Sequence, residues 1–496
     1  MKIPREIEQI SQILATNGFK AYLVGGCVRD LLLDIQPKDW DLTTDAKPDK
    51  LQELFPDSVY ENDFGTVGVK TDSGDSTLKI VEITTFRKEG KYTDKRHPDE
   101  VVFADTVEED LSRRDFTINA IAIGMGDDDK VVDPFGGQKD LENKLIKAVG
   151  DAKERFDEDA LRIMRAVRLS AQLGLEIEKK TADAISDKAK LLKNIASERI
   201  RDELEKLLMT ERAGDGIRKM EELGLLKEVL PELSEGVGVE QNKHHIYDVF
   251  EHNVRSLEYS VSKDFSCELR LASLLHDVGK VGTREWKNDS KGDKAKGNKK
   301  GDWTFYQHQY LGEKITRDIM NRLKFPKEMI KKVTLLVREH MFVYDPEVVT
   351  EKGVRRLLHR VGEENADDLI KVREADRIGS GVPKAQPYRL RHLQAMIEKA
   401  KGEPVSVKQL KIDGGVLIKE VGMEPGPKMG YVLAILLEEV LDEPKLNIKK
   451  ELLEKARKLS SLSEKNLKKM ADKARKTAVE EQKRLDDAIK GKYFVK

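Results

Sequence analysis

Hydrophobic and polar positions follow two patterns along the chain, and the change falls near residue 150. Before that point, short runs rich in β-branched residues alternate with turns of Gly, Asp or Pro, as strands do in an α/β arrangement. Beyond it, apolar residues recur at helical spacing and strand signals almost vanish. The pattern predicts a small α/β head followed by a mostly helical body. The expected strands lie in AYLVGG, TVGVK, LKIVEITTF, VVFAD, INAIAIG and KVVDPF.

Four segments follow from this pattern and from the motifs described below. They are the head at 1–150, a helical neck at 151–235, a second helical domain at 236–380 and a C-terminal helical region at 381–496. Residues 282–303 interrupt the helical pattern with a Gly-, Lys- and Asp-rich stretch, which we expect to be a polar surface insertion.

Composition restricts the compartment and the class of partner. The 496 residues carry a net charge of −1 and contain two cysteines, Cys27 and Cys267, without a CxxC pattern. Disulfides and thiolate zinc sites are therefore not expected, and a reducing cytoplasm is the natural location. No apolar run reaches the roughly 18 residues that a membrane span needs, so we expect no membrane partner.

Positive charge gathers at the end of the chain. From Lys445 onward there are 17 Lys or Arg residues against 8 Asp or Glu residues, in a segment of helical composition. Such an excess suits a phosphate backbone. A solvated helix without a partner is the alternative interpretation.

The stretch YLVGGCVRDLLLDIQPKDWDLTT, residues 22–44, combines three features of a phosphate site. A buried strand ends at Gly25 and Gly26, and a helix is expected to start near Val28. The glycines allow a triphosphate to approach free backbone N–H groups at the positive end of the helix. Arg29 would add a fixed cation.

Two aspartates follow, one residue apart. In a strand, Asp39 and Asp41 point to the same face, about 7 Å apart along the chain, while Trp40 points to the other. Two like charges this close are unfavourable unless a cation lies between them, and Mg²⁺ suits carboxylates beside phosphates.

These motifs, with RRDFTINA (113–120), DPFGGQKDL (133–141) and RFDEDALRIMRAVR (155–168), resemble the bacterial and eukaryotic class of tRNA CCA-adding nucleotidyltransferases and the related bacterial poly(A) polymerases. The resemblance runs from about residue 20 to 235 and implies an α+β protein with a polymerase-β-like head. It implies that Asp39 and Asp41 bind two metal ions, with Glu82 as a third carboxylate. Residues that would hold the nucleotide are Gly25, Gly26, Arg29 and Arg114 at the triphosphate and Asp115 at the sugar.

Selection of the base is expected in the helix at 155–168. Phe156, Ala160, Ile163 and Val167 recur at helical spacing and predict a buried stripe, while Asp159, Arg162 and Arg165 follow at intervals of three on a neighbouring face. A carboxylate beside a guanidinium would accept cytosine and adenine and leave uracil and guanine with unpaired polar groups. The alternative interpretation is that these residues form a surface salt bridge without a role in base recognition. The resemblance assigns base recognition to Glu158, Asp159 and Arg162, with Arg165 and Arg168 nearby.

Two features favour addition of CCA from CTP and ATP to tRNA over related activities. The segment RKEGKYTDKRHPDE (87–100) corresponds to the flexible loop that CCA-adding enzymes use when they switch from C to A and that CC-only relatives lack. The strand EITTFR is also more similar to CCA enzymes than to poly(A) polymerases. Poly(A) polymerase and A-only or CC-only addition stay open, as does a phosphohydrolase with a non-polymerising head.

Histidines form a second group. Seven of the nine lie between residues 244 and 359, and LASLLHDVGK (271–280) ends an apolar helical run with an HD pair. An isolated HD pair is more often structural, but its neighbours resemble the HD superfamily of metal-dependent phosphohydrolases. The implied ligands of Mn, Fe, Ni, Co or Mg are His252, His276, Asp277, His308, His340 and Asp376. A metal-bound water would attack a phosphoester.

The segment VKQLKIDGGVLIKEVGMEPGPKMGYVLAILLEEVL (407–441) resembles the C-terminal helical element of the same enzymes. Together with the basic tail, it is expected to bind tRNA through phosphates, by shape more than by sequence.

Overall fold

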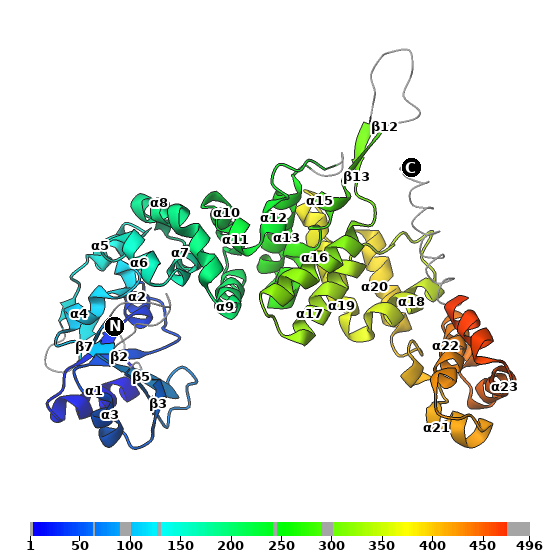
Figure 1. Cartoon of the computed structure of the whole chain (residues 1–496), viewed down its shortest axis with the longest axis horizontal. Coiled ribbons are helices and arrows are strands. Elements are labelled where there is room, and N and C mark those ends of the chain that lie inside the picture. Colours follow the sequence, from blue (N-terminus) through cyan, green and yellow to red (C-terminus); the bar gives the residue numbers. More distant parts are fainter. Residues whose placement is uncertain are drawn as a thin grey trace, which may run out of the picture. The chain divides into compact units, whose positions relative to one another are not determined.

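The computed structural model describes residues 3–62, 65–89, 101–125, 130–241, 246–288 and 301–473. Two compact units divide the chain, the first made of 1–235 with 319–325 and the second of 236–318 with 326–496 (Figure 1). Most of the expected loop at 87–100, and the tail beyond residue 473, lie outside the described residues. None of the described helices is long and apolar enough to cross a bilayer.

A seven-stranded sheet forms the centre of the head, with strand order β3-β4-β5-β2-β1-β8-β9. Neighbouring strands are antiparallel except for β2 and β5, which are parallel. The strands are β1 (Ala21–Val24), β2 (Asp41–Thr44), β3 (Ser58–Asn62), β4 (Thr66–Lys70), β5 (Ile80–Thr85), β8 (Ala122–Gly124) and β9 (Val131–Val132). A separate pair joins β6 (Arg87–Glu89) to β7 (Val101–Phe103). Each of the six predicted runs contains a strand.

Alternation along β5 explains how the sheet presents polar groups. Val81 and Ile83 are fully buried, whereas Ile80 and Glu82 are exposed. Because successive side chains of a strand point to opposite faces, one face of β5 packs into the core and the other carries Glu82.

Helices pack around this sheet through stripes of apolar residues. In the first helix Ile7, Ile10 and Leu14 are buried at spacings of three and four, as an amphipathic helix requires. The helices of the head are α1 (Arg5–Thr16), α2 (Gly26–Leu32), α3 (Pro48–Leu54), α4 (Val107–Ser112) and α5 (Gly137–Glu142).

The neck is helical, and its predicted buried stripe is confirmed: Phe156, Ala160, Ile163 and Val167 are at most 1% exposed. The prediction of a single helix over residues 155–168 is wrong, because α6 ends at Glu158 and α7 begins at Leu161. The neck helices are α6 (Ala152–Glu158), α7 (Leu161–Leu173), α8 (Lys179–Lys188), α9 (Ser197–Leu208), α10 (Ala213–Glu222), α11 (Leu226–Val229) and α12 (Pro231–Ser234). A short parallel pair joins β10 (Leu145–Ile146) to β11 (Glu176–Ile177).

The second unit is mostly helical but contains one hairpin. The predicted polar insertion at 282–303 contains a strand near each end: β12 (Glu285–Asn288) pairs antiparallel with β13 (Gly301–Thr304). The helices are α13 (Val249–Ser262), α14 (Cys267–Leu275), α15 (Lys280–Thr283), α16 (His308–Arg322, which reaches into the first unit's segment), α17 (Lys327–Glu339), α18 (Glu351–Val361), α19 (Glu363–Gly379), α20 (Tyr388–Ala400), α21 (Gly414–Val416), α22 (Pro427–Asp442) and α23 (Lys449–Ser460).

The DPFGGQKDL motif buttresses the segment that follows RRD. The Asp133 carboxylate accepts hydrogen bonds from the backbone N–H groups of Gly137 (2.7 Å) and Gln138 (3.0 Å) at the start of α5. Asp140, one turn later, accepts from the Thr117 hydroxyl at 2.7 Å. The motif therefore caps α5 and ties it to the turn at Thr117–Asn119.

Replacing Asp133 by Ala should lower the free energy of unfolding of the head by about 1–2 kcal/mol, because two backbone donors lose their acceptor. Urea unfolding followed by circular dichroism measures this loss. Asp57→Ala is the control, since the Asp57 side chain is 82% exposed and its ion pair with Lys70 should contribute less than about 1 kcal/mol. Equal midpoints for the two variants would contradict the capping role.

Candidate functional site

The turn between β1 and α2 brings a guanidinium and a carboxylate to the same backbone position. Gly25 has φ 77° and ψ −134°. A Cβ atom on Gly25 would lie 2.9 Å from Nη1 of Arg114 and 3.5 Å from Oδ2 of Asp41. Glycine is required here by conformation and by space. The helix begins at Gly26, two residues earlier than predicted.

The carboxylates are arranged differently from the prediction. The strand expected over DWD starts only at Asp41, so Asp39 lies before it and is exposed, while Trp40 is buried. The partner of Asp41 in register is Glu82, on the neighbouring parallel strand. Burial raises the pKa of Asp41, Arg114 opposes that shift, and Asp39 adds to it. An oxygen-rich edge of the sheet results.

The RRD motif is held by an aspartate that sequence reasoning missed. Asp110 of α4 is fully buried and accepts hydrogen bonds from Nε of Arg113 (2.9 Å) and Nη2 of Arg114 (3.4 Å). Burial opposes its ionisation, but the two guanidinium groups outweigh burial and lower the pKa of Asp110. Asp110 thus fixes the direction of Arg114.

Asp115 is held by three hydrogen-bond donors. Its oxygens accept from Nδ2 of Asn119 (3.1 Å), from the backbone N–H of Phe116 (2.9 Å) and from Nε of Arg165 (2.8 Å). Burial acts against the charge, but Arg165 and Asn119 hold the pKa of Asp115 well below its usual range. Asn119 also accepts from Arg29 at 2.9 Å, so the predicted residues Arg29 and Asp115 share one amide.

Three arginines of the neck contact the segment 112–115, which contains the RRD motif. Arg155 donates to the carbonyl of Ser112 (3.2 Å), Arg162 to that of Arg113 (3.1 Å), and Arg165 forms the ion pair with Asp115. The neck and the catalytic head of the first unit therefore meet at this turn.

The proposed base-reading residues form two ion pairs rather than one. Nη1 of Arg162 lies 2.6 Å from Glu158, whereas the carboxylate of Asp159 is bound by both terminal nitrogens of Arg199, at 3.2 and 2.7 Å. The predicted pair of Asp159 beside Arg162 assumed a continuous helix and is wrong. The helix is interrupted at Asp159, whose side chain accepts a hydrogen bond from the backbone N–H of Leu161 at the start of α7. Arg199 was not among the predicted site residues.

Arg168 lies away from these pairs. Its Nε is 2.6 Å from Glu203 of α9, and its Nη1 donates to Gln172. Glu203 is 3% exposed, so Arg168 neutralises a buried carboxylate between α7 and α9.

A second constellation lies in the second unit, where two groups of potential metal ligands share one aspartate. They are His252, His276, Asp277 and Asp376, and Asp277, His308 and His340. Oδ2 of Asp277 is 3.0 Å from Nε2 of His252, and Oδ1 is 3.1 Å from Nε2 of His308. All six residues are buried. Asp277 thus faces both groups, one oxygen toward each.

The histidine rings are oriented for cation binding. Nδ1 of His276, His308 and His340 lies 2.6–2.8 Å from the backbone carbonyl three residues earlier in each case. A proton on Nδ1 leaves the Nε2 lone pair free to bind a metal. Nε2 of His252 lies 2.9 Å from Nε2 of His276, and Nε2 of His308 lies 3.3 Å from Nε2 of His340. Facing lone pairs repel each other unless a cation or proton lies between them.

Two glycines allow the elements that carry the ligands to meet. A Cβ atom on Gly279 would lie 2.1 Å from the carbonyl oxygen of His308, and one on Gly379 would lie 2.2 Å from Oγ of Ser256 and 2.7 Å from the carbonyl oxygen of His252. These contacts bring α16 against the HD turn and α19 against α13. Close packing of these elements therefore explains why glycine occupies positions 279 and 379 in HDVGK and EADRIG.

Two cations balance the buried carboxylates. Nζ of Lys280 lies 2.5 Å from Asp277, and Nη1 of Arg373 lies 2.5 Å from Asp376. Burial opposes ionisation, but these cations hold the pKa of both carboxyl groups below the usual range. Burial itself lowers the pKa of His340 to about 4, which keeps that ring neutral at physiological pH. Burial acts to lower the pKa of His276, but Asp277 and Asp376 outweigh burial and raise that pKa to about 10, so this ring holds a proton that a bound cation would replace. Imidazoles and carboxylates are the donor set of a divalent transition metal.

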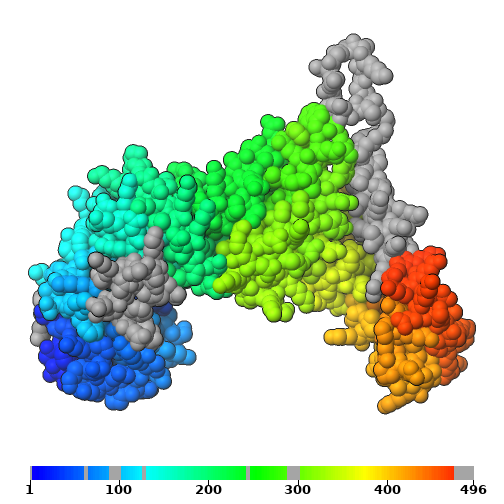
Figure 2. Space-filling model, in the orientation of Figure 1, coloured from blue at the N-terminus to red at the C-terminus, as the bar shows by residue number. Residues whose placement is uncertain are grey.

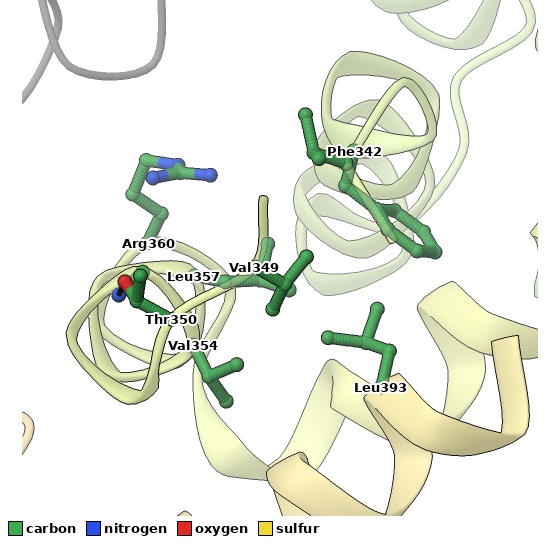
Figure 3. A pocket seen from close by; sticks show the side chains of 9 residues that line it. Phe342, Val349, Thr350, Val354, Leu357, Arg360 and Leu393 are labelled. Carbon is green, nitrogen blue, oxygen red and sulfur yellow. Dashed lines mark hydrogen bonds between the residues drawn. The ribbon is translucent and has the colours of Figure 1, made fainter. Parts of the chain in front are cut away.

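A pocket of the second unit lies elsewhere among its helices (Figure 3). Its walls come from Phe342, Val349, Val354, Leu357 and Leu393, with Arg360 and Thr350 also labelled at its edge. Arg360 pairs with Glu339 at 3.0 Å. The walls carry neither a carboxylate nor a histidine, so this pocket offers no acid, base or metal ligand.

The head defines the class of the protein. A mixed sheet with carboxylates on two adjacent strands, a glycine turn and a mostly helical body is a polymerase-β-like nucleotidyltransferase fold. Residues 21–147 match the family model for the Poly A polymerase head domain, and 174–236 match that for the RNA and SrmB-binding site of polymerase A. Residues 298–456 match the model for tRNA nucleotidyltransferase domain 2.

Relatives narrow the class. The CCA-adding enzyme of Lactiplantibacillus plantarum is 32% identical over 464 residues, which cover 92% of this chain and 97% of the relative. That of Lactobacillus helveticus is 41% identical over 57% of this chain and 67% of the relative. The CCA-adding enzyme of Leuconostoc citreum is 48% identical over a match that covers 45% of this chain and 55% of the relative. The chain belongs to the CCA-adding enzymes, which are tRNA nucleotidyltransferases.

Solved structures agree. The structure of the Bacillus stearothermophilus CCA-adding enzyme in complex with CTP aligns with a TM-score of 0.67 and 28% identity, over 94% of this chain and all of that one. A tRNA nucleotidyltransferase complexed with a primer tRNA and an incoming ATP analogue, 20% identical with a TM-score of 0.53, shares the fold.

Replacing Arg165 by Met should destabilise the first unit by about 1–3 kcal/mol at pH 7.5, because Asp115 loses its charged partner in a buried position. The lower part of this range is expected, since Arg165 is 35% exposed and water screens the pair. Because Arg165 helps to hold the pKa of Asp115 below its unfolded value, the pair contributes fully above the unfolded carboxyl pKa and its contribution is lost as the pH falls below it. The loss should therefore be constant between pH 8 and 5 and should shrink as the pH falls below about 4. A loss independent of pH in urea unfolding would contradict the ion pair.

Proposed function

We propose that the first unit adds nucleotides from CTP and ATP to the 3′ end of tRNA and so completes or repairs its terminal CCA. The observation that carries the proposal is the position of Asp41, in register with Glu82 and close to Arg114 at the Gly25 turn. Carboxylates and a fixed guanidinium at one strand edge are what a nucleoside triphosphate and its metal ions need. Membership of the CCA-adding enzymes supports the same reaction.

The donor set fits Mg²⁺, because Asp39, Asp41 and Glu82 offer only oxygen ligands. Burial raises the pKa of Asp41, which is the situation of a carboxylate that lacks its countercharge. Two bound ions would activate the tRNA 3′-hydroxyl and stabilise the leaving pyrophosphate. Arg114, held by Asp110, positions the triphosphate, and Gly25 keeps the backbone clear of it.

Base selection is proposed for the two ion pairs of the neck. Glu158 beside Arg162, and Asp159 beside Arg199, each place a carboxylate acceptor next to guanidinium donors. Cytosine and adenine both show an amino donor beside a ring-nitrogen acceptor and can satisfy such a pair, whereas uracil and guanine leave it unsatisfied. The protein would then act as the template. Arg165 holds Asp115 in place for the sugar, and Arg168 supports the neck.

A primer-extension assay tests this function. The purified protein, with Mg²⁺, receives tRNA transcripts that end before CCA, at C or at CC, and each of the four nucleoside triphosphates. We expect CCA followed by a stop, and a loss of at least 100-fold in rate for Asp41→Asn. Asp34→Asn is the control, because Asp34 is exposed and its positive φ of 56° suits Asn. Long A tails would identify a poly(A) polymerase, and A added only to the CC end would identify an A-only enzyme.

We further propose that the second unit hydrolyses phosphate esters at its histidine and aspartate cluster, as HD phosphohydrolases do. The specific support is Asp277, whose two oxygens face separate histidine groups, as a carboxylate shared by two cations would. His252, His276 and Asp376 would hold one ion, and His308 and His340 the other. The imidazole-rich set fits Mn, Fe, Co or Ni better than Mg. Bound ions would supply a water of lowered pKa and neutralise the phosphate.

Removal of the shared ligand tests this second function. A variant with His276→Ala and Asp277→Ala should lose its bound transition metal, measured by inductively coupled plasma mass spectrometry, and its hydrolysis of 2′,3′-cyclic AMP. CCA addition should stay within about twofold. Asp264→Asn is the matched control, since Asp264 is 97% exposed with a positive φ. Equal metal content in both variants would overturn the metal site, and loss of both activities would overturn their independence.

A further inference from the structure

Tyr344 and Arg377 lie close to the candidate metal ligands of the second unit. Arg377 comes directly after Asp376 on α19, and Tyr344 lies four residues after His340, between α17 and α18. Nη1 of Arg377 donates a hydrogen bond to the Tyr344 hydroxyl at 2.9 Å. Both residues are half-buried, so a polar pair that solvent can reach follows two of the candidate ligands.

Arg373 connects this pair to the ligand cluster. Its Nη1 lies 2.5 Å from Oδ2 of Asp376, and its guanidinium carbon lies 5.3 Å from the centre of the Tyr344 ring. The same Nη1 lies 3.6 Å from Sδ of Met341, which is 44% exposed. Figure 2 shows part of the segment 340–390, yellow-green to yellow, at the surface of the second unit. Tyr344, Arg373 and Arg377 therefore form a rim between the cluster and solvent.

The two arginines of the rim differ in their partners. Asp376, a carboxylate of the cluster, balances the charge of Arg373. Arg377 forms no ion pair with any residue that the structure describes, and its Nε donates to the backbone carbonyl of Lys384 at 3.3 Å. Two of the five guanidinium N–H groups of Arg377 are thus used, which leaves three for a ligand.

Two carboxylates close to the rim in sequence have partners of their own. Asp345 follows Tyr344 and pairs with Arg389 at 3.2 Å. Glu374, on α19, is 6% exposed and accepts hydrogen bonds from the Tyr259 hydroxyl (3.0 Å) and from Nε2 of Gln386 (2.6 Å). Neither carboxylate neutralises the unpaired arginine of the rim.

The Tyr344 hydroxyl responds to this positive charge. Burial acts to raise the pKa of Tyr344, but Arg373 and Arg377 outweigh burial and lower that pKa. Two guanidinium groups that favour an ionised phenol would also favour a bound anion at the same place.

We propose that Arg377 and Tyr344 bind a second phosphate of the substrate, while the reacting phosphate lies at the histidine and aspartate cluster. The position of the reacting phosphate rests on the proposed phosphohydrolase function. A guanidinium with three remaining N–H groups and a hydroxyl beside it offer several donors to phosphate oxygens. Arg373 is committed to Asp376 and holds that ligand in place.

The arrangement indicates how far apart the two phosphates are. Successive residues of a helix point about 100° apart, so the side chains of Asp376 and Arg377 diverge. Arg373 and the Tyr344 ring lie between them in the series of contacts. Two phosphates on either side of a sugar, as in an oligonucleotide or a nucleoside bisphosphate, suit this separation better than two phosphates joined directly.

Binding without turnover tests the second phosphate site. In EDTA, isothermal titration calorimetry compares adenosine 3′,5′-bisphosphate with adenosine 3′-phosphate, which lacks only the second phosphate. The parent should bind the bisphosphate at least tenfold more tightly, and Arg377→Gln should reduce this ratio to below about three. Equal affinities of the parent for the two ligands, or an unchanged ratio in the variant, would overturn the proposal.

Controls separate binding from a structural role of Arg377, which also holds the loop at Lys384. Arg391→Gln is the matched control, because Arg391 is an exposed arginine of α20 without an ion pair among the described residues, and its ratio should equal that of the parent. Near-ultraviolet circular dichroism checks the fold of each variant. Tyr344→Phe takes the place of Arg377→Gln if the loop is disturbed, and should lower the ratio about threefold because one donor is lost.

A dinucleotide distinguishes the two sources of the second phosphate. Adenylyl-(3′→5′)-adenosine 3′-phosphate carries that phosphate as a diester instead of a terminal group. Affinity equal to that for the bisphosphate would support the site and identify an oligonucleotide as its ligand. Tight binding of the bisphosphate alone would support the site and identify a nucleotide with a terminal phosphate.

Hydrolysis separates this proposal from the function on which it partly rests. The metal-loaded protein receives 2′,3′-cyclic AMP and the same compound with a 5′-phosphate. The ratio of kcat/KM for the phosphorylated compound to that for 2′,3′-cyclic AMP should fall at least tenfold in Arg377→Gln. No hydrolysis of either compound would refute the phosphohydrolase function, while calorimetry would still decide the second phosphate site. Hydrolysis of both with the same ratio in parent and variant would overturn the role of Arg377.

Discussion

The ion pair between Asp115 and Arg165 is the contact on which the first unit depends. It joins the last residue of RRD to α7, and Arg155 and Arg162 donate to the carbonyl oxygens of Ser112 and Arg113 in the same segment. A shift of this turn would move Arg114 relative to the carboxylates of the sheet and relative to α7. The residues proposed to bind the triphosphate and those proposed to read the base would thereby share one rigid frame, as a reaction that needs both at once requires.

Short-range patterns predicted most of the elements. Apolar alternation located six strand-containing runs of the head, and the stripe from Phe156 to Val167 is buried as expected, because burial at fixed spacing depends on few neighbours. The six histidine and aspartate residues of the second unit were drawn from distant segments by resemblance. The structure brings their ligand atoms together in two groups that share Asp277.

What escaped prediction depends on contacts between segments. Arg199 lies forty residues from Asp159, and an exposed-looking arginine in an amphipathic helix carries no sign of its partner. The helix break at Asp159 was hidden because a capping aspartate and a helical aspartate look alike in sequence. The hairpin was missed because its strands are short and flank a long polar stretch, so that only the cross-strand pairing of Trp286 and Trp303 reveals it.

The facing imidazoles of the second unit have a thermodynamic consequence. Backbone carbonyls already hold the rings of His276, His308 and His340, so a cation would find these ligands in place and lose little binding energy to ordering them. Ion binding would also remove the repulsion between nitrogen lone pairs and would favour only the folded state. The stability of this unit would then rise with the logarithm of the free metal concentration. Metal supply would set how much of this unit is folded as well as how much of it is active.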